Sequence, residues 1–197
     1  MKILLTGGTG KYGQSLLAGL LEDGHAVHTA QRTPLNEATY HCDWRDVAEP
    51  TRLVLNMIDR GHEYDSMVFA HCMREAAKPS SPNLCFSVED HIRVNCSAIL
   101  SVVQFVGMYG RLTRGAKIIL LGDEDPAGHP DEVPYFVSKR AMQALAQYIA
   151  PQIARSGVSV AVANLPKVDA PNSLERASRA VRTLLMGNVI PGTVLPA

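Results

Sequence analysis

The sequence predicts an α/β protein whose doubly wound parallel sheet lies between two layers of helices, as a single domain over residues 1–197. Two observations lead to this prediction. Short apolar runs, which are typical of buried strands, alternate with segments whose apolar residues recur at helical spacing. The first strand-to-helix transition contains a glycine-rich turn, and no internal repeat or linker divides the chain. Because strand–helix alternation favours a parallel sheet covered on both faces, we expect three layers.

The first half of the chain predicts four strands and two helices. The predicted strands are short runs rich in apolar and β-branched residues: 2–5, 25–30, 39–42 and 66–71. The first helix repeats leucine at helical spacing before a stop at Gly24. Its leucines are Leu16, Leu17, Leu20 and Leu21. A second helix is predicted over residues 50–60.

An irregular stretch interrupts the alternation at residues 74–86, which are rich in Pro and Ser and predict a surface excursion near the mouth of a site. Ser87 and Asp90 have the spacing of a capping box, so a helix is predicted to begin at Ser87. The inward-facing residues of this helix are predicted to be Ile92, Ile99, Val103 and Val106.

The alternation then continues to the end of the chain. Residues 117–121 and 158–165 predict the fifth and sixth strands, with a helix containing Tyr135 between them. Residues 190–195 look like the start of a closing strand. Ligands of such sheets bind at the carboxyl ends of the strands, near the switch in strand order. The loops after the first, fourth and fifth strands are therefore expected to supply the site.

The glycine-rich turn reads Thr-Gly-Gly-Thr-Gly-Lys-Tyr-Gly over residues 6–13. Glycine permits a tight turn and lets a ligand approach the backbone closely. The helix that follows offers free N–H groups and the positive end of its dipole to a pyrophosphate. The spacing is G-x-x-G-x-x-G, which differs from the G-x-G-x-x-G of the commonest dinucleotide fold. The alternative interpretation is an ordinary glycine-rich connection between a strand and a helix.

Tyr135 and Lys139 form the second motif, because positions four apart are neighbours on one face of a helix. A nearby cation favours the phenolate, so Lys139 is expected to lower the Tyr135 pKa from its ordinary value of about 10. Such a phenol would serve as an acid or base near neutral pH.

Together, these motifs resemble the short-chain dehydrogenase/reductase family, with a loop in the form more typical of its extended and atypical members. The resemblance runs along nearly the whole chain and implies a Rossmann-type fold, a nicotinamide cofactor and hydride transfer to or from a small-molecule substrate. It makes Tyr135 the proton carrier, Lys139 the group that holds the nicotinamide ribose, and Asn95 the anchor of a water on the proton path. The alternative for Asn95 is a structural amide in the core.

The resemblance also implies which residues contact the cofactor. Asp43, with Trp44 after it, follows the third strand, where the family places an adenine-binding Asp. Residues 70–72 stand where many members carry Asn-Ala-Gly, and residues 164–167 resemble the family's Pro-Gly segment. The implied cofactor-binding residues are Gly7, Thr9, Gly10, Lys11, Tyr12, Gly13, Arg32, Asp43, Trp44, Ala70, His71, Cys72, Tyr135, Lys139, Pro166 and Val168.

The end of the second strand favours NADP(H) over NAD(H). NAD-binding sites usually place an Asp or Glu there to accept from the ribose 2′-OH, but this chain has Gln31. Arg32 follows, and its planar guanidinium suits a phosphate, while Lys11 offers a second positive charge. The alternative is that Arg32 is a solvated surface arginine.

One landmark of the family is missing. The active-site Ser usually precedes the Tyr by thirteen residues, and that position is Gly122 here. Asp123 and Glu124 follow, and they resemble part of the Thr-Asp-Glu of nucleotide-sugar dehydratases. Further acidic residues and one histidine lie in the same stretch: Asp125, His129, Asp131 and Glu132. Gly122, Asp123 and Glu124 are therefore candidate substrate residues, although the acidic stretch also fits a solvated loop.

Three function classes remain open: an NADP(H)-dependent oxidoreductase, a related dehydratase, isomerase or epimerase, and a dinucleotide-binding sensor or scaffold without activity. The formal net charge is +0 and the pI about 7.0, which gives no case for a nucleic-acid or membrane partner. No apolar run approaches the roughly 20 residues of a membrane span. The four cysteines form no C-x-x-C pair, so we expect reduced thiols, a cytoplasmic location and no metal. By the resemblance, we expect a homodimer or homotetramer, with Val102, Met108 and Met142 as candidate contacts.

Overall fold

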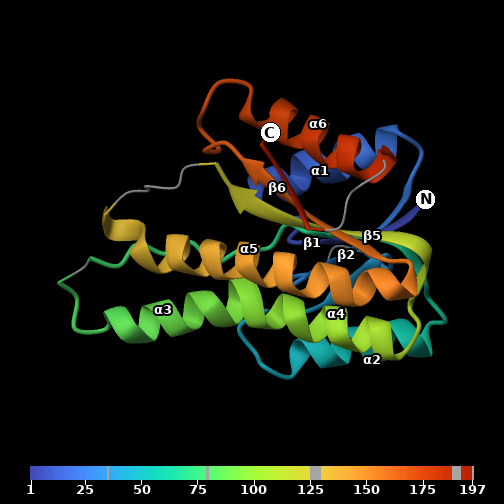
Figure 1. The fold of residues 1–197 in the computed structure, drawn as a ribbon, viewed down its shortest axis with the longest axis horizontal. Helices are drawn as coiled ribbons and strands as arrows, with labels where there is room; N and C mark the ends of the chain where they lie inside the picture. The colour runs from blue at the N-terminus through green and yellow to red at the C-terminus, as the bar shows by residue number, and fades with distance from the viewer. Residues whose placement is uncertain (35, 79, 125–129, 188–191, 197) are drawn as a thin grey trace.

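The computed structural model describes residues 1–34, 36–78, 80–124, 130–187 and 192–196. In this part of the chain, seven parallel strands form one sheet in the order β3-β2-β1-β4-β5-β6-β7 (Figure 1). The strands are β1 Lys2–Thr6, β2 Ala26–Gln31, β3 Thr39–His41, β4 Tyr64–Phe69, β5 Leu112–Asp123, β6 Ser159–Leu165 and β7 Thr193–Pro196. The helices are α1 Lys11–Glu22, α2 Glu49–Asp59, α3 Leu84–Ile92, α4 Ala98–Met108, α5 Val133–Ile153 and α6 Ser173–Met186. The predicted α/β class and parallel sheet are confirmed.

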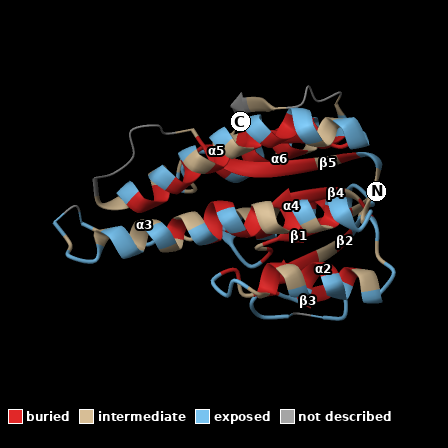
Figure 2. Ribbon diagram, turned by 60° about the horizontal axis from the view of Figure 1, so that its bottom comes forward, coloured by how far each residue is buried: buried red, intermediate tan, exposed pale blue. Residues whose placement is uncertain are grey.

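The helices cover both faces of the sheet, with α1 and α6 on one face and α2, α4 and α5 on the other (Figure 1). Alternate residues of each strand point to opposite faces. Ile3 and Leu5 of β1 therefore join the apolar cluster under α1 and α6, whereas Leu4 joins the cluster under α2, α4 and α5. Figure 2 shows the buried strands between helices whose outer faces are exposed.

The strand order switches at β1. The chain passes from β1 outward to β2 and β3, then crosses to β4 on the other side of β1. The carboxyl ends of β1 and β4 lie side by side, with Thr6 opposite Phe69. This crevice is where open parallel sheets bind their ligands.

Helices α3 and α4 are joined by one π-helical turn at Arg93–Ser97. The combined helix Leu84–Met108 has 25 residues and is the one helix of the described residues with the length and composition of a membrane span. Polar residues such as His91 and Arg93 interrupt the apolar run of this helix, so the sequence alone did not indicate a segment of membrane-span length. Its most apolar window is 44% buried, and α3 packs against α5. Core helices of soluble proteins meet the same criteria.

Several predicted boundaries were wrong. Helix α3 begins at Leu84 rather than Ser87, and its N-cap residue is Asn83, so Ser87 lies inside the helix and the predicted capping box does not form. Strand β5 begins at Leu112, five residues before the predicted start, and its first residues pair with the start of β4. The sequence analysis did not place α6. Of the predicted inward residues, Ile99, Val103 and Val106 are buried and Ile92 is half-buried.

Candidate active site

The glycine-rich loop folds tightly over the end of β4. Gly7 has φ +69°, and a Cβ atom at this position would lie 2.6 Å from the His71 backbone. A Cβ atom on Gly13 would lie 2.0 Å from the Gly7 carbonyl oxygen. Both positions therefore exclude a side chain. Gly10 differs, because its Cβ would meet only the Gly7 carbonyl, at an ordinary 3.6 Å. The packing of the loop does not require this third glycine, which lines a cavity instead.

A cavity of about 290 Å³ opens at the switch in strand order. Nine of the residues predicted to bind a cofactor line it: Gly7, Thr9, Gly10, Arg32, Asp43, Trp44, Ala70, His71 and Cys72. The lining also includes Gln31, Arg45, Met73 and Val94. Segments that are distant in sequence thus meet at one edge of the sheet, as parallel topology requires.

His71 is a buried, neutral histidine in the wall of this cavity. Its Nε2 donates a hydrogen bond to the Val94 carbonyl, 3.1 Å away, and its Nδ1 accepts from the Thr6 hydroxyl at 2.7 Å. Burial is the main cause that lowers the His71 pKa to about 3, and the positive charge of Lys139 lowers it further. The imidazole also stacks on the Trp44 indole, with ring centroids 3.8 Å apart and planes 2° from parallel.

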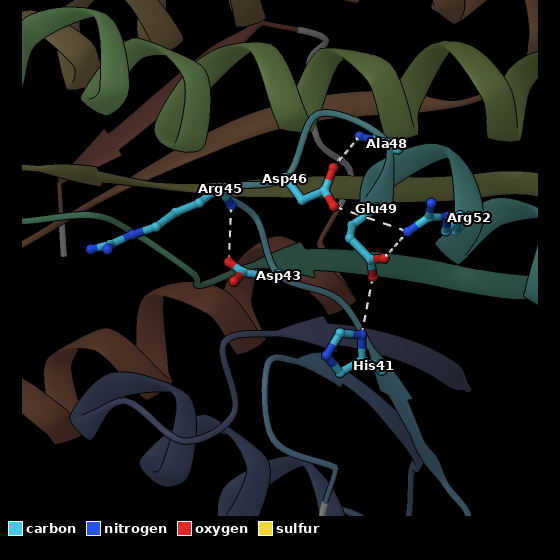
Figure 3. Close-up of polar contacts among 7 residues, drawn as sticks. All are labelled: His41, Asp43, Arg45, Asp46, Ala48, Glu49 and Arg52. Carbon is cyan, nitrogen blue, oxygen red and sulfur yellow. Dashed lines mark hydrogen bonds and ion pairs between the residues drawn. The ribbon is translucent and has the colours of Figure 1, made fainter. Parts of the chain in front are cut away.

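The loop that carries Trp44 is held by its own acidic residues (Figure 3). Asp43 Oδ1 accepts from the Arg45 backbone N–H at 3.1 Å, and Asp46 Oδ1 accepts from the Ala48 N–H at 2.8 Å. These short-range bonds satisfy the turn from within. The Arg45 side chain extends away from this turn (Figure 3) and pairs with Glu75. The turn thereby fixes the position of Trp44 beside the cavity.

Two buried polar atoms of the cavity lining have no hydrogen-bond partner within the described residues: Gln31 Oε1 and Trp44 Nε1. Gln31 is 2% exposed and Trp44 is 7% exposed. Gln31 Nε2 donates to the Thr33 carbonyl at 2.9 Å, which leaves Oε1 as the open acceptor. Because an unsatisfied buried polar atom costs about 1–3 kcal/mol, these two atoms are open to a donor and an acceptor from whatever fills the cavity.

Tyr135 lies near the start of α5 and is 5% exposed. Its hydroxyl donates to Asp123 Oδ2 at 2.9 Å. The Arg74 guanidinium lies 4.8 Å from the centre of the phenol ring, and Glu132 holds it with two hydrogen bonds of 2.9 Å. Burial raises the Tyr135 pKa well above its ordinary range, and the neighbouring Cys72 and Asp123 side chains raise it further. The expected lowering of this pKa was therefore wrong.

Lys139 does not contact the phenol oxygen. Its Nζ donates to the Leu121 carbonyl at 2.7 Å and lies 5.7 Å from the centre of the Tyr135 ring. Burial is the main cause that lowers the Lys139 pKa. The helical spacing correctly placed both side chains on one face of α5. It could not show that the end of β5 provides the closer partner of each, a carboxylate for Tyr135 and a carbonyl for Lys139.

Asn95 is a fully buried amide in the π-helical turn. Its Nδ2 donates to the Met73 carbonyl and to Ser138 Oγ, each at 2.9 Å, and its Oδ1 accepts from the Met73 N–H at 2.6 Å. The side chain thus clamps the segment after β4 against α5, which is the structural alternative of the sequence analysis. Residues 70–73 line the cavity and Arg74 covers the Tyr135 ring, so this segment connects the cavity to Tyr135.

The space beside Gly122 is filled. A Cβ atom there would lie 2.1 Å from Asn164 Oδ1 and 2.9 Å from Val162 Cγ1. Asn164 is opposite Gly122 in the β5–β6 register, and its Oδ1 accepts from Gln143 Nε2 at 2.7 Å. The missing serine therefore leaves no vacancy. Asn164 was expected in the Pro-Gly-like segment 164–167. Its contact with position 122 was not predicted, because only the strand register shows that the two residues face each other.

The other candidates lie outside the lining of this cavity. Glu124 pairs with Arg176 of α6 at 2.8 Å, and Asp125 and His129 lie outside the described residues. Lys11 is exposed and pairs with Asp169 at 3.3 Å. The Tyr12 hydroxyl donates to the Pro166 carbonyl, and the Val168 carbonyl accepts from Ser173. A second cavity, of about 530 Å³, is lined by Arg74, Glu132, Lys167, Val168, Asp169 and Ala170.

No protein-family model matches the chain, and no curated protein matches it. Solved structures share its fold. A short chain dehydrogenase family protein from Francisella tularensis superposes with a TM-score of 0.81 at 15% identity, over 99% of this chain and 96% of that one. A short chain dehydrogenase from Leptospira borgpetersenii with bound NAD⁺ gives 0.83 at 14% identity, over 99% and 90%.

A third solved structure is the 3-alpha-hydroxysteroid dehydrogenase from Pseudomonas sp. B-0831 complexed with NADH. It gives a TM-score of 0.78 at 18% identity, over 100% of this chain and 94% of that one. At these identities the likeness shows a shared fold, and the function has to be argued from the site.

Proposed function

We propose that this chain is an NADP(H)-dependent oxidoreductase of the short-chain dehydrogenase/reductase kind, which reduces a carbonyl or oxidises an alcohol on a small molecule. One observation carries the proposal. A single segment, residues 70–74, joins the cavity at the β1–β4 switch to the buried pair Tyr135 and Lys139. A dinucleotide in that cavity would thus end beside a group suited to carry a proton.

The residues fit a nicotinamide dinucleotide. The backbone around Gly7 and Gly10 forms a cradle from which side chains are absent, and the N-terminus of α1 follows it. Gln31 Oε1 would accept from a ribose hydroxyl, and Trp44 Nε1 would donate to a ligand acceptor. Two of the structural neighbours are described as holding NAD⁺ or NADH. When bound, the nicotinamide supplies or accepts the hydride.

Arg32 supports the preference for NADP(H). It is exposed, lines the cavity, and makes no hydrogen bond or ion pair within the described part of the chain. It is therefore available to a 2′-phosphate. Gln31 adds no negative charge that would repel such a phosphate. Lys11 contributes less to the preference for NADP(H) than the sequence suggested, because it forms an ion pair with Asp169.

In this function Tyr135 gives a proton to the carbonyl oxygen during reduction and takes it back during oxidation. Lys139, whose Nζ donates to the Leu121 carbonyl and lies 5.7 Å from the centre of the ring, would contact the cofactor ribose. The backbone of residues 73–74 is fixed by Asn95, so Asn95 positions Arg74 over the phenol. Arg74 also lines the second cavity, where we place the substrate.

A second candidate, elimination or isomerisation with a bound cofactor, is favoured by the direct hydrogen bond between Tyr135 and Asp123. The ion pair of Glu124 with Arg176 disfavours it, because a catalytic base there would first have to leave its partner. The third candidate, a sensor without activity, rests on the missing serine alone.

Tyr135→Phe separates these candidates. The purified chain is assayed for oxidation of NADPH across a panel of aldehydes and ketones, and for cofactor binding by calorimetry. We expect turnover by the native chain, a loss of about 10²–10⁴-fold in the variant, and nearly unchanged binding, because only the proton-carrying oxygen is removed. Native turnover that survives in Tyr135→Phe would contradict the proton role. Binding without turnover on any substrate would favour the other two candidates.

We further propose a cytoplasmic homodimer or homotetramer without nucleic-acid or membrane partners. Of the three predicted contacts, Met108 is exposed. Val102 and Met142 are buried in the core of the protomer, so their prediction as interface contacts was wrong. Other exposed apolar side chains on and beside α4 and α5 are Tyr109, Val133, Val137 and Tyr148. Sedimentation across micromolar concentrations tests this assembly, since it distinguishes a dimer from a monomer of 21.3 kDa.

A further inference from the structure

The position that would carry the active-site hydroxyl is closed in this protein. Gly122 has no side chain, and the Asn164 amide oxygen already stands 2.1 Å from where its Cβ would be. Gln143 holds that amide in place. The partner of the Tyr135 hydroxyl must therefore come from elsewhere in the chain.

The next residue of the same strand is this partner. Asp123 is the last residue of β5 and is 7% exposed. Its Oδ2 accepts a hydrogen bond from the Tyr135 hydroxyl, with the two oxygens 2.9 Å apart. Two residues earlier on β5, the Leu121 carbonyl accepts a hydrogen bond from the Lys139 ammonium. The end of β5 thus fixes both Tyr135 and Lys139, one through a carboxylate and the other through the backbone.

This arrangement changes what Tyr135 is able to do alone. A buried phenol beside a carboxylate holds its own proton firmly, because ionisation would place two negative charges about 3 Å apart. Arg74, from the segment after β4, and Lys139, from α5, are the cations that face the ring. Cys72 also faces it, and Tyr12 of α1 faces Asp123. Neither cation hydrogen-bonds to the phenol oxygen, whereas Asp123 does.

We propose that Asp123 is the proton partner of Tyr135, so that the phenol relays a proton between the substrate oxygen and the Asp123 carboxylate. The proposal rests on the oxidoreductase function proposed above. In oxidation, the alcohol carbon gives its hydride to the nicotinamide and the alcohol oxygen gives its proton to the Tyr135 oxygen. Tyr135 passes its own proton to Asp123, which ends as a carboxylic acid and releases the proton to water. Reduction runs the same transfers backward.

Asp123→Asn tests the proposal, because the amide keeps the shape and an acceptor oxygen but cannot take a proton. The control is Glu49→Gln, which removes a carboxylate of α2 that is buried to a similar degree, at 8% exposed. Glu49 pairs with His41 of β3 and with Arg52 of its own helix, and does not pair with Tyr135. Circular dichroism establishes folding of each variant, and Asp123→Ser provides a second neutral substitution.

The first measurement needs no turnover. In the cofactor-free chain with labelled tyrosine, NMR at neutral pH should show a slowly exchanging, downfield hydroxyl proton that disappears in Tyr135→Phe. Charge-assisted hydrogen bonds are shorter and roughly twice as strong as neutral ones, so the resonance should move upfield in Asp123→Asn and stay in place in Glu49→Gln. A missing resonance, or one that Asp123→Asn leaves in place, would overturn the proposal.

The second measurement is the pH profile of kcat/KM for the best substrate of the carbonyl panel. Asp123→Asn should lower kcat/KM by about 10²-fold or more and change the profile, while Glu49→Gln should leave both unchanged. Equal profiles in the native chain and Asp123→Asn would overturn the relay. If the native chain turns over no substrate but the hydroxyl resonance behaves as expected, the oxidoreductase function fails and the pairing of Tyr135 with Asp123 stands.

Discussion

Acidification should destabilise this protein through His71, and the size of the effect follows from its burial. The folded chain keeps the imidazole neutral down to a pKa of about 3, whereas an unfolded histidine titrates near 6.5. Between these values the unfolded state binds the extra proton, so the free energy of unfolding falls as the pH falls. Above pH 6.5 protonation of His71 does not affect the free energy of unfolding. Below pH 6.5 this free energy falls by about 1.4 kcal/mol per pH unit, so that about 2 kcal/mol is lost by pH 5.

The assay uses the single tryptophan of the chain, which stacks on His71 itself. Urea unfolding is followed by Trp44 fluorescence at a series of pH values, in the native chain and in His71→Gln. The free energy of unfolding is plotted against pH for each chain. Because the variant lacks the titrating group, the difference between the two slopes separates the effect of His71 from that of His28 and His62, whose pKa values are also lowered. Parallel stability curves for the two chains between pH 6.5 and 4 would refute the reasoning.

Two further predictions concern the cavity and the closed position. Arg32→Ala should weaken NADP(H) binding about tenfold or more and leave NAD(H) binding nearly unchanged, because a charge-assisted hydrogen bond is worth about 1.5–3 kcal/mol. Calorimetry with both cofactors measures the two affinities. Equal affinities for NADP(H) and NAD(H) in the native chain would contradict the prediction. Gly122→Ser should destabilise the fold by about 1–3 kcal/mol, since its Cβ meets the Asn164 amide oxygen at 2.1 Å. The double variant with Asn164→Ala should recover part of that loss in urea unfolding, and a single variant as stable as the native chain would contradict the overlap.

Local patterns in the sequence were sufficient to predict the class of fold and the floor of the cavity. The glycine spacing of residues 7–13 sits where a strand turns into a helix, and parallel topology brings every strand end to one edge. The assignment of residues on separate strand ends, such as Asp43 and His71, to one site came from the family resemblance, and both residues line the cavity. The start of α3 was not predicted because Ser87 and Asp90 imitate a cap, whereas the helix begins three residues earlier.

The partners inside the site could not be predicted, because they depend on packing between elements. The spacing of Tyr135 and Lys139 shows that they share a helix face, but not that β5 lies closer to both polar groups than they lie to each other. Asn95 likewise has the residue type of a catalytic amide. Its hydrogen bonds to Met73 depend on how the segment after β4 folds back, which no periodicity indicates.

The missing serine is best understood as one part of a coupled change. Gly122 and Asn164 occupy opposing positions in the β5–β6 register, so the loss of a side chain on one strand accommodates the amide of the other. A side chain at 122 would therefore require a change at 164 as well. The acceptor for the Tyr135 hydroxyl is the next residue of β5, the carboxylate of Asp123. A carboxylate accepts a proton that a serine could only pass on, and it would repel an alkoxide forming beside it. Under the proposed oxidoreductase function, chemistry at this site would depend on Tyr135 exchanging its proton with Asp123 as charge develops on the substrate oxygen.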